Sequence, residues 1–243
     1  MEKHVVIISG ATSGIGLATL QGLCEDGYTV VGFGRSAEKI AAVLPGLREQ
    51  FGSDAVELHA LDVRDVEAVQ AFVSDVHARH HRIDGLVNAA GVMRVERSHT
   101  VSEASFDLQV DTLLKGTFFL TTAVLPFMIE QDGGLIINIG SLSGLRAAPK
   151  MAVYGAAKAA INNLTQSLAA EYADNGIRAI CINPGVVDTP LMDTLLLATI
   201  QKRVPLKRLA SPQEIAYLVR FLFSSDASYV TGAAVTIDGG LGL

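Results

Sequence analysis

The chain has 243 residues, of which 49% are hydrophobic, and its formal net charge is −6 at pH 7. This composition supports a sizeable core and excludes a disordered chain, while scattered charges of both signs exclude a polybasic nucleic-acid surface. No apolar run approaches the length of a bilayer span, and the N-terminus has neither a signal nor a transit pattern. We therefore expect a soluble, cytoplasmic protein that binds neither nucleic acid nor membrane.

Strand-like and helix-like patterns alternate along the chain. Short runs that are apolar on both faces predict parallel strands at residues 5–9, 29–32, 56–60, 86–88, 135–139, 179–183 and 234–237. Helical patterns lie between them, at residues 14–25, 38–51, 65–79, 103–129, 153–174 and 212–223. The last begins with a capping box at Ser211, Pro212 and Glu214. This alternation predicts one α/β domain over residues 1–243, a doubly wound seven-stranded parallel sheet with helices on both faces (a Rossmann fold).

A glycine-rich turn follows the first strand and opens the first helix. It reads Gly10, Ala11, Thr12, Ser13, Gly14, Ile15 and Gly16. Glycines there permit a tight turn and let the backbone approach a pyrophosphate, to which the helix N-terminus offers free N–H groups. The alternative is a simple strand–helix turn. Its position between the first strand and the first helix favours the dinucleotide interpretation.

The end of the second strand predicts which dinucleotide binds. An acidic residue at this point would bind the ribose hydroxyls of NAD and repel a 2′-phosphate. Gly34 stands in that place, followed by Arg35 and Ser36. The planar donor fork of arginine suits a phosphate group, so we expect NADP(H). The alternative is a surface arginine that precedes a helix.

The next two strand ends supply further cofactor contacts. Asp62 and Val63, after the third strand, are placed to frame the adenine edge. The fourth strand ends in small residues where backbone must pass close to a cofactor: Asn88, Ala89, Ala90 and Gly91.

Tyr154 and Lys158 lie four residues apart in a predicted helix, with Ser141 at the end of the preceding strand. Residues at this spacing share a helix face, and an ammonium about 4 Å from a phenol at an effective dielectric of about 20 stabilises the phenolate by roughly 4 kcal/mol. We therefore expect a lowered Tyr154 pKa and a proton donor, with the Ser141 hydroxyl holding a carbonyl oxygen. An ordinary amphipathic helix would show the same Tyr–Lys spacing.

In combination, these motifs resemble the short-chain dehydrogenase/reductase family over essentially the whole chain. The resemblance rests on the glycine turn, Asn88 to Gly91, Ser141, Tyr154 with Lys158, Asn183-Pro184-Gly185, Thr189-Pro190, Thr231-Gly232 and Asp238-Gly239-Gly240. It implies that Tyr154 is the catalytic acid/base, that Ser141 orients the substrate carbonyl and that Lys158 holds the nicotinamide ribose. It further implies a nicotinamide pocket formed by Pro184, Gly185, Val187 and Thr189.

One position departs from the family pattern. The family has an asparagine in a helix, three residues before a glycine, and Leu113 stands there, before Gly116. By resemblance, the asparagine secures a kink whose main-chain carbonyl holds a water of the lysine-linked proton relay. Leu113 keeps the carbonyl and loses the amide, so we expect an active enzyme with an altered proton-transfer step.

Substrate contacts are expected from residues that follow the strand ends: Met93, Ser143, Val186 and Leu191. The resemblance implies a lid at about residues 189–205, and its leucine-rich sequence favours an apolar substrate. Arg94 and Arg146 also follow strand ends, although arginines more often face solvent than substrate. No Cys/His spacing fits a metal, and we read the cluster His77, His80 and His81 as a solvated helix end.

We therefore predict an NADPH-dependent carbonyl reductase that acts on a small carbonyl or alcohol substrate. A 3-oxoacyl-carrier-protein reductase is the rival, which we rank second because acidic turns at residues 130–134 and 171–175 would repel an acidic carrier. A third hypothesis, supported by Leu113 alone, is a weakly catalytic NADP-binding regulator. Apolar residues on more than one face of helices 103–129 and 153–174 predict a second subunit, and the resemblance implies a homotetramer.

Overall fold

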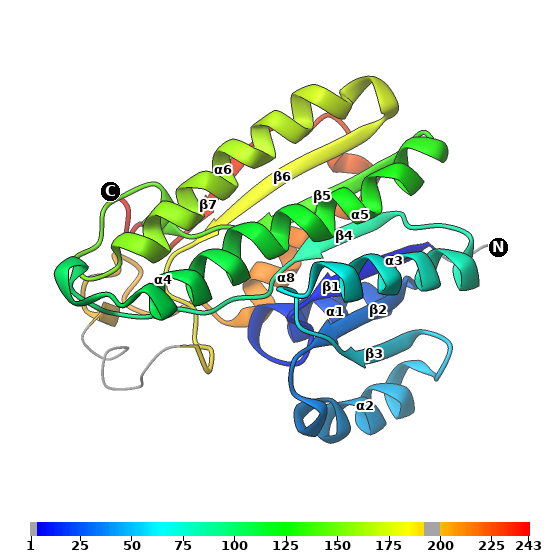
Figure 1. The fold of residues 1–243 in the computed structure, drawn as a ribbon, viewed down its shortest axis with the longest axis horizontal. Helices are drawn as coiled ribbons and strands as arrows, with labels where there is room; N and C mark the ends of the chain where they lie inside the picture. The colour runs from blue at the N-terminus through cyan, green and yellow to red at the C-terminus, as the bar shows by residue number, and fades with distance from the viewer. Residues whose placement is uncertain (1–3, 192–199) are drawn as a thin grey trace.

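Seven parallel strands form one sheet, in the order β3-β2-β1-β4-β5-β6-β7, in the computed structural model, which describes residues 4–191 and 200–243 (Figure 1). The strands are β1 (Val5–Ser9), β2 (Thr29–Gly34), β3 (Val56–Ala60), β4 (Gly85–Asn88), β5 (Gly134–Ile139), β6 (Ile177–Pro184) and β7 (Ala234–Ile237). The chain winds outward in opposite directions from β1 and β4. Ligands bind beyond the carboxyl ends of the strands at such a switch point.

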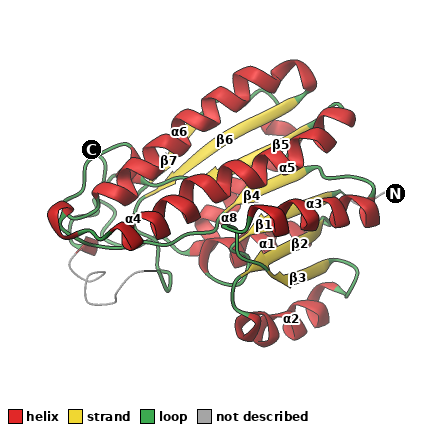
Figure 2. Ribbon diagram, viewed as in Figure 1, coloured by secondary structure: helices red, strands yellow, loops and turns green. Residues whose placement is uncertain are grey.

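Helices cover both faces of the sheet (Figure 2). They are α1 (Gly14–Glu25), α2 (Ala37–Phe51), α3 (Val66–His80), α4 (Glu103–Val110), α5 (Gly116–Glu130), α6 (Ala152–Tyr172) and α8 (Pro212–Phe223). In β1, Val6 and Ile8 pack on the side of α1, α2 and α8, whereas Val5 and Ile7 pack on the side of α3, α5 and α6. Both faces of the strand are therefore buried, and the predicted fold class is confirmed.

Most element boundaries lie within one or two residues of the prediction. β1, β3, β7, α1 and α8 have the predicted limits, and the capping box at Ser211 and Glu214 is present. The helix predicted to end at Asp174 ends instead at Tyr172 and continues as a 3-10 turn, Ala173–Asn175.

The predicted helix 103–129 is interrupted by a π-helical turn, Asp111–Lys115, between α4 and α5. The Gly116 N–H donates to the Asp111 carbonyl, one residue further back than in an α-helix. A Cβ on Gly116 would lie 2.8 Å from the Val63 side chain, so only glycine permits this approach to the loop after β3. The π-helical turn therefore places the start of α5 against the loop that follows β3.

This helical run is also apolar enough to cross a membrane by length and composition alone, over Glu103–Glu130. The expectation that no apolar run approaches that length is therefore wrong. Half of its most apolar window is buried within the fold, where α5 packs on α3 and the sheet, which is the behaviour of a core helix.

Candidate active site

The turn after β1 forms a cradle in which three glycines leave the backbone uncovered. Gly10 and Gly14 have positive φ, at 71° and 54°. A Cβ on Gly16 would lie 2.3 Å from the Gly10 carbonyl oxygen, and one on Gly14 would lie 3.1 Å from Thr189. Non-glycine residues would be strained or would clash here, so the backbone is open to a ligand at the first helix N-terminus.

The end of β4 lies directly against this turn. A Cβ on Gly10 would meet the Ala89 and Ala90 backbone at 2.8 Å, and both of their amides donate to the buried Ser9 hydroxyl at 3.2 Å. Ser9 is a support that sequence patterns did not reveal, because a serine at a strand end has no distinctive spacing.

Arg35 and Ser36 follow β2 and line the rim of a cavity that also includes the glycine turn. The Ser36 hydroxyl accepts from the Lys39 amide and caps α2. The Lys39 side chain also lines the cavity, which places a second cation beside Arg35. Lys39 was not predicted, since a lysine in a first helical turn reads as an exposed surface residue.

The structure brings Ser141 and Tyr154 together. Ser141 follows β5, Tyr154 lies in the first turn of α6, and the Ser141 side chain is close enough to the phenol to lower its pKa. Two glycines allow this contact: a Cβ on Gly144 would lie 2.7 Å from the Lys158 backbone, and one on Gly155 would lie 2.8 Å from the Ser143 carbonyl. The serine loop therefore rests on the helix that carries the tyrosine.

Lys158 lies one turn further along α6 and is only 6% exposed. Its Nζ donates to the Ile139 carbonyl at the end of β5 and lies 5.9 Å from the centroid of the Tyr154 ring. Burial lowers the pKa of Lys158 from 10.5 to about 8, so the amine remains mostly protonated at pH 7.

The expected lowering of the Tyr154 pKa is wrong for the protein without cofactor. The phenol is 7% exposed, and its burial raises the pKa, although the Ser141 side chain partly opposes this rise. Lys158 makes no resolved contribution, because its amine is turned to the Ile139 carbonyl. A protonated phenol at neutral pH is the form that donates a proton.

Two buried asparagines hold the catalytic elements in register. Asn183 Oδ1 accepts from the Ser141 amide at 3.0 Å, and Asn183 Nδ2 donates to Asn162 Oδ1 at 2.7 Å. Asn162 Nδ2 in turn donates to the Lys158 carbonyl at 3.1 Å. Asn183 belonged to a predicted motif, whereas Asn162 carried no signal beyond its place in a helix.

Two predicted cofactor residues lie outside the cavity lining. The Asn88 side chain points into the core, where its Nδ2 donates to Asn138 at 2.8 Å and to Thr121 at 3.2 Å. Asp62 is paired with Arg64 at 2.7 Å, which lowers its pKa against the opposing effect of burial. The backbone of the fourth strand end and Val63 do line the cavity, through Ala89, Ala90, Gly91 and Val63.

Leu113 is 1% exposed and packs beside Tyr154 and Ala157, together with Val92 and Met93. The π-helical turn is thus present without the family's asparagine, and apolar packing replaces the amide.

The preceding residue, Thr112, lines the cavity and is 4% exposed. Its Oγ1 has no hydrogen-bond partner within the protein. The Oγ1 atom is itself shielded from solvent, as are the unpartnered Thr19 Oγ1 and Asn88 Oδ1, so it does not by itself mark a ligand contact.

One continuous cavity of about 880 Å³ joins these features at the carboxyl ends of the strands. Its lining includes the remaining predicted cofactor residues, Thr12, Ser13, Ile15, Pro184, Gly185, Val187 and Thr189, and the predicted substrate residues Met93, Ser143, Val186 and Leu191. Ile200 and Arg203, in the last part of the predicted lid, also line the cavity. Residues 192–199 of the predicted lid lie outside the described residues.

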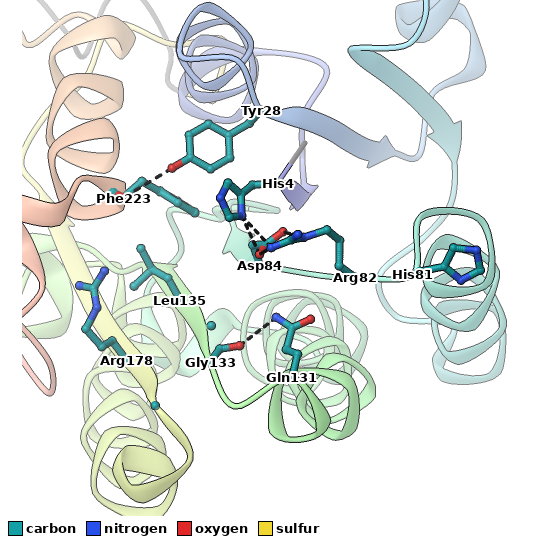
Figure 3. Close-up of a pocket in the computed structure, with 12 residues that line it drawn as sticks. His4, Tyr28, His81, Arg82, Asp84, Gln131, Gly133, Leu135, Arg178 and Phe223 are labelled. Atoms are coloured by element: carbon teal, nitrogen blue, oxygen red, sulfur yellow. Dashed lines mark hydrogen bonds and ion pairs between the residues drawn. The ribbon is translucent and has the colours of Figure 1, made fainter. Parts of the chain in front are cut away.

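A second cavity, of about 590 Å³, lies at the amino ends of the strands (Figure 3). Several of its polar groups are engaged within the protein: Asp84 binds both His4 and Arg82, and Gln131 donates to the Gly133 carbonyl. Arg178 donates to the carbonyls of Leu222, Ala227 and Val230.

No group of three potential metal ligands occurs among residues 4–191 and 200–243. In the predicted His77, His80 and His81 cluster, His77 stacks on Phe127 with ring centroids 4.0 Å apart, and His80 pairs with Glu57 at 3.0 Å. These contacts are structural.

Comparison with known proteins identifies the family of this chain. The sequence profile described as Enoyl-(Acyl carrier protein) reductase matches residues 10–242. The 3-oxoacyl-[acyl-carrier-protein] reductase FabG of Thermotoga maritima is 35% identical over 99% of this chain and 98% of its own length. The chain belongs to the short-chain dehydrogenase/reductase family. It is therefore an oxidoreductase that acts on carbonyl or hydroxyl groups.

Solved structures of short-chain dehydrogenases/reductases have the same fold. Levodione reductase is 33% identical, with a TM-score of 0.93 over 98% of this chain and 97% of that one. A variant of actinorhodin polyketide ketoreductase, solved with NADPH, is 32% identical, with a TM-score of 0.93 over 99% and 97%. The glycine cradle and the cations on the rim fit a nicotinamide dinucleotide in the present family member.

Proposed function

We propose that the protein is an NADPH-dependent carbonyl reductase, which converts a ketone or aldehyde reversibly to an alcohol. The observation that carries this proposal is the approach of the Ser141 side chain to Tyr154 inside the cavity, with the buried Lys158 one turn beyond. Two donors that converge on one point can bind a carbonyl oxygen and stabilise the charge that develops there.

The residues divide the proton chemistry between them. Bound NADPH supplies the hydride at the carbonyl carbon. Ser141 donates a hydrogen bond to the carbonyl oxygen, and Tyr154 gives its phenolic proton to the same oxygen. The Lys158 Nζ lies 5.9 Å from the centroid of the Tyr154 ring, so its ammonium stabilises the phenolate once it turns from the Ile139 carbonyl. Because burial raises the Tyr154 pKa, the protonated form needed for reduction prevails at neutral pH.

Cofactor choice follows from the end of β2. Arg35 and Lys39 line the cavity there, and no acidic side chain does so among the described residues. An acidic residue would oppose a 2′-phosphate, whereas these two cations attract it. This arrangement supports NADPH over NADH.

The second candidate is a 3-oxoacyl-carrier-protein reductase. The relationship to FabG favours it. The acidic turns, which were expected to repel an acidic carrier, are residues 130–134 and 171–175. They precede β5 and β6, at the edge of the sheet opposite the catalytic cavity. Their charge therefore bears on the mouth of a catalytic site only if a second subunit brings them there.

The third candidate, an NADP-binding regulator without turnover, receives little support. Leu113 is accommodated by packing, and the Ser141–Tyr154 contact is intact. Turnover of any carbonyl substrate would remove this candidate.

We also propose a homotetramer. On α4 and α5, Phe106 is 48% exposed and Phe118 is 42% exposed, while Tyr217 and Phe221 on α8 are 60% and 47% exposed. Two separate apolar faces fit an assembly with more than one twofold axis. Light scattering at micromolar concentration should give four times the monomer mass of 25.6 kDa, and a monomer would refute the proposal.

The decisive experiment is a screen of ketones, diketones, quinones and oxoacyl thioesters with NADPH, followed by the loss of absorbance near about 340 nm, where reduced nicotinamide absorbs. We expect turnover of at least one carbonyl class, with kcat/KM at least about ten-fold lower for NADH. No turnover of any class by protein that binds NADPH would overturn the proposal and favour the regulator.

A further inference from the structure

The charge of the catalytic cavity is opposite to that of the protein. The chain has 25 acidic and 19 basic residues, yet no aspartate or glutamate lines this cavity in the part of the chain that is described. Its cationic lining residues are Arg35, Lys39, Arg94, Arg146, Lys158 and Arg203. Such a lining focuses a positive potential on whatever enters.

The cofactor accounts for only part of this charge. Arg35 and Lys39 lie at the end of β2, where the adenosine phosphate is expected, and Lys158 lies beside Tyr154. Arg94, Arg146 and Arg203 come from other loops: after β4, after β5 and after the lid segment. Because the cofactor phosphate is assigned to Arg35 and Lys39, the charges of these three arginines are left for the substrate.

These three arginines differ from the five arginines that pair with a carboxylate. Arg64, Arg79, Arg82, Arg208 and Arg220 each pair with a carboxylate at 2.9 Å or less. Arg94, Arg146 and Arg203 have no ion pair within residues 4–191 and 200–243.

Nearby carboxylates are engaged elsewhere. Glu96 accepts from the Ser105 hydroxyl, and Asp238 accepts from the Gly240 and Gly242 amides. The Asp238 contacts hold the C-terminal turn. This turn lies beside Arg146, since a Cβ on Gly242 would lie 3.8 Å from Arg146 Nε. The tail therefore supports the arginine without an Asp or Glu partner for it.

An apolar wall lines part of the same cavity. It is formed by Val92, Met93, Leu142, Met151, Val186 and Leu191. A substrate that fills the cavity would place its carbonyl at Ser141 and Tyr154, an apolar segment along this wall, and its far end among the arginines.

We propose that Arg94, Arg146 and Arg203 form an anion subsite, and that the substrate is a carbonyl compound with a carboxylate or phosphate beyond an apolar segment. This inference rests on the proposed reductase function. The contact is made equally before and during hydride transfer, so it lowers KM rather than raising kcat. Because the arginines are exposed, salt weakens it.

The test uses two matched substrate pairs with NADPH. One pair is 6-oxoheptanoic acid and its methyl ester, and the other is acetoacetyl-coenzyme A and the neutral acetoacetyl N-acetylcysteamine thioester. We expect about ten-fold lower KM for the charged member at low salt, falling as salt rises. The pair with the larger ratio distinguishes a carboxylate from a phosphate source.

The variants are Arg94→Ala, Arg146→Ala and Arg203→Ala, alone and combined. The combined variant should bring the KM ratio of charged to neutral substrate to about one, and Arg146→Lys should restore part of the Arg146→Ala loss. Arg97→Ala is the matched control, since Arg97 is on the same loop as Arg94 but does not line the cavity. Equal KM values within each pair, or a ratio that the combined variant leaves unchanged, would overturn the subsite.

Binding of 6-oxoheptanoate and its ester to NADPH-loaded protein, followed by ligand-detected NMR, separates the two proposals. Arginine-dependent preference for the acid without NADPH oxidation would overturn the reductase function and leave the subsite standing. Oxidation of NADPH without a preference for the acid would do the reverse.

Discussion

The two cavities of this protein lie at opposite edges of one sheet and differ in what their polar groups do. At the amino edge, Asp84 binds His4 and Arg82 (Figure 3). Arg178 donates to three backbone carbonyls. At the carboxyl edge, Arg94, Arg146 and Arg203 line the cavity without an ion pair among the described residues. A cavity whose polar groups are satisfied by the protein is structural, whereas one that leaves them open is built for a ligand.

The largest expected effect comes from removing the proton donor at the carboxyl edge. Tyr154→Phe should lower kcat by about 10²–10⁴-fold while NADPH binding is retained, because only the hydroxyl is lost. Tyr217→Phe, which changes an exposed tyrosine on α8, should have no effect. Steady-state kinetics and NADPH titration measure both. A Tyr154→Phe variant with near-normal kcat would remove the tyrosine from the mechanism.

The buried amine should make stability depend on pH. Burial lowers the Lys158 pKa from 10.5 to about 8, so between these values only the unfolded chain binds the proton. The contribution of Lys158 to the free energy of unfolding should therefore rise by about 3 kcal/mol as pH rises through this window. Below about pH 8 the cost of burying the ammonium is fully present.

Urea unfolding of the cofactor-free protein tests this dependence. The rise should appear in the difference between unmodified protein and Lys158→Met, and should be absent from the difference with Lys202→Met, an exposed lysine. A Lys158→Met difference that does not change with pH would show that the amine is not buried as a cation.

Arg35→Ala should weaken NADPH binding by about ten- to a hundred-fold and leave NADH nearly unchanged, since only the 2′-phosphate contact is lost. Arg48→Ala, on the exposed side of α2, is the control. The reciprocal change Gly34→Asp is less clean, because a Cβ there lies 3.0 Å from the Thr12 side chain. Equal losses for both cofactors would place Arg35 away from the phosphate.

The smallest effect is expected at Leu113. Leu113→Asn should keep kcat within about ten-fold, because Ser141, Tyr154 and Lys158 are already in place. It should cost about 1–3 kcal/mol of stability if the buried amide finds no partner. Leu120→Asn, an equally buried change in α5, separates stability from catalysis. If only Leu113→Asn turns over and the unmodified protein does not, the proton relay is broken by leucine.

The sequence predicts the fold well where one physical pattern dominates. Strands buried on both faces read as apolar runs, and Gly10, Gly14 and Gly16 mark a turn that tolerates no side chain. The relation of Ser141 to Tyr154 follows from strand ends and helix spacing, and the structure confirms that they meet.

The failures have physical causes as well. The π-helical turn at Asp111–Lys115 lies within an unbroken apolar helix pattern, and periodicity is insensitive to a single inserted residue. The Tyr154 pKa was misjudged because spacing along a helix sets proximity and not burial. The edge at which the acidic turns lie follows from connectivity, since a helix-to-strand turn in a parallel sheet falls at the amino ends.

The link between Asn183 and the Ser141 amide has a consequence for dynamics. Asn183 is fully buried in β6, and its Oδ1 holds the amide of a residue whose hydroxyl faces the cavity. Exchange of that amide with deuterium therefore requires β6 and the serine loop to separate, which is an opening of the sheet core rather than a loop fluctuation. The Ser141 amide should exchange about as slowly as the core amides of β5, so that the catalytic serine is lost to unfolding only when the sheet itself opens.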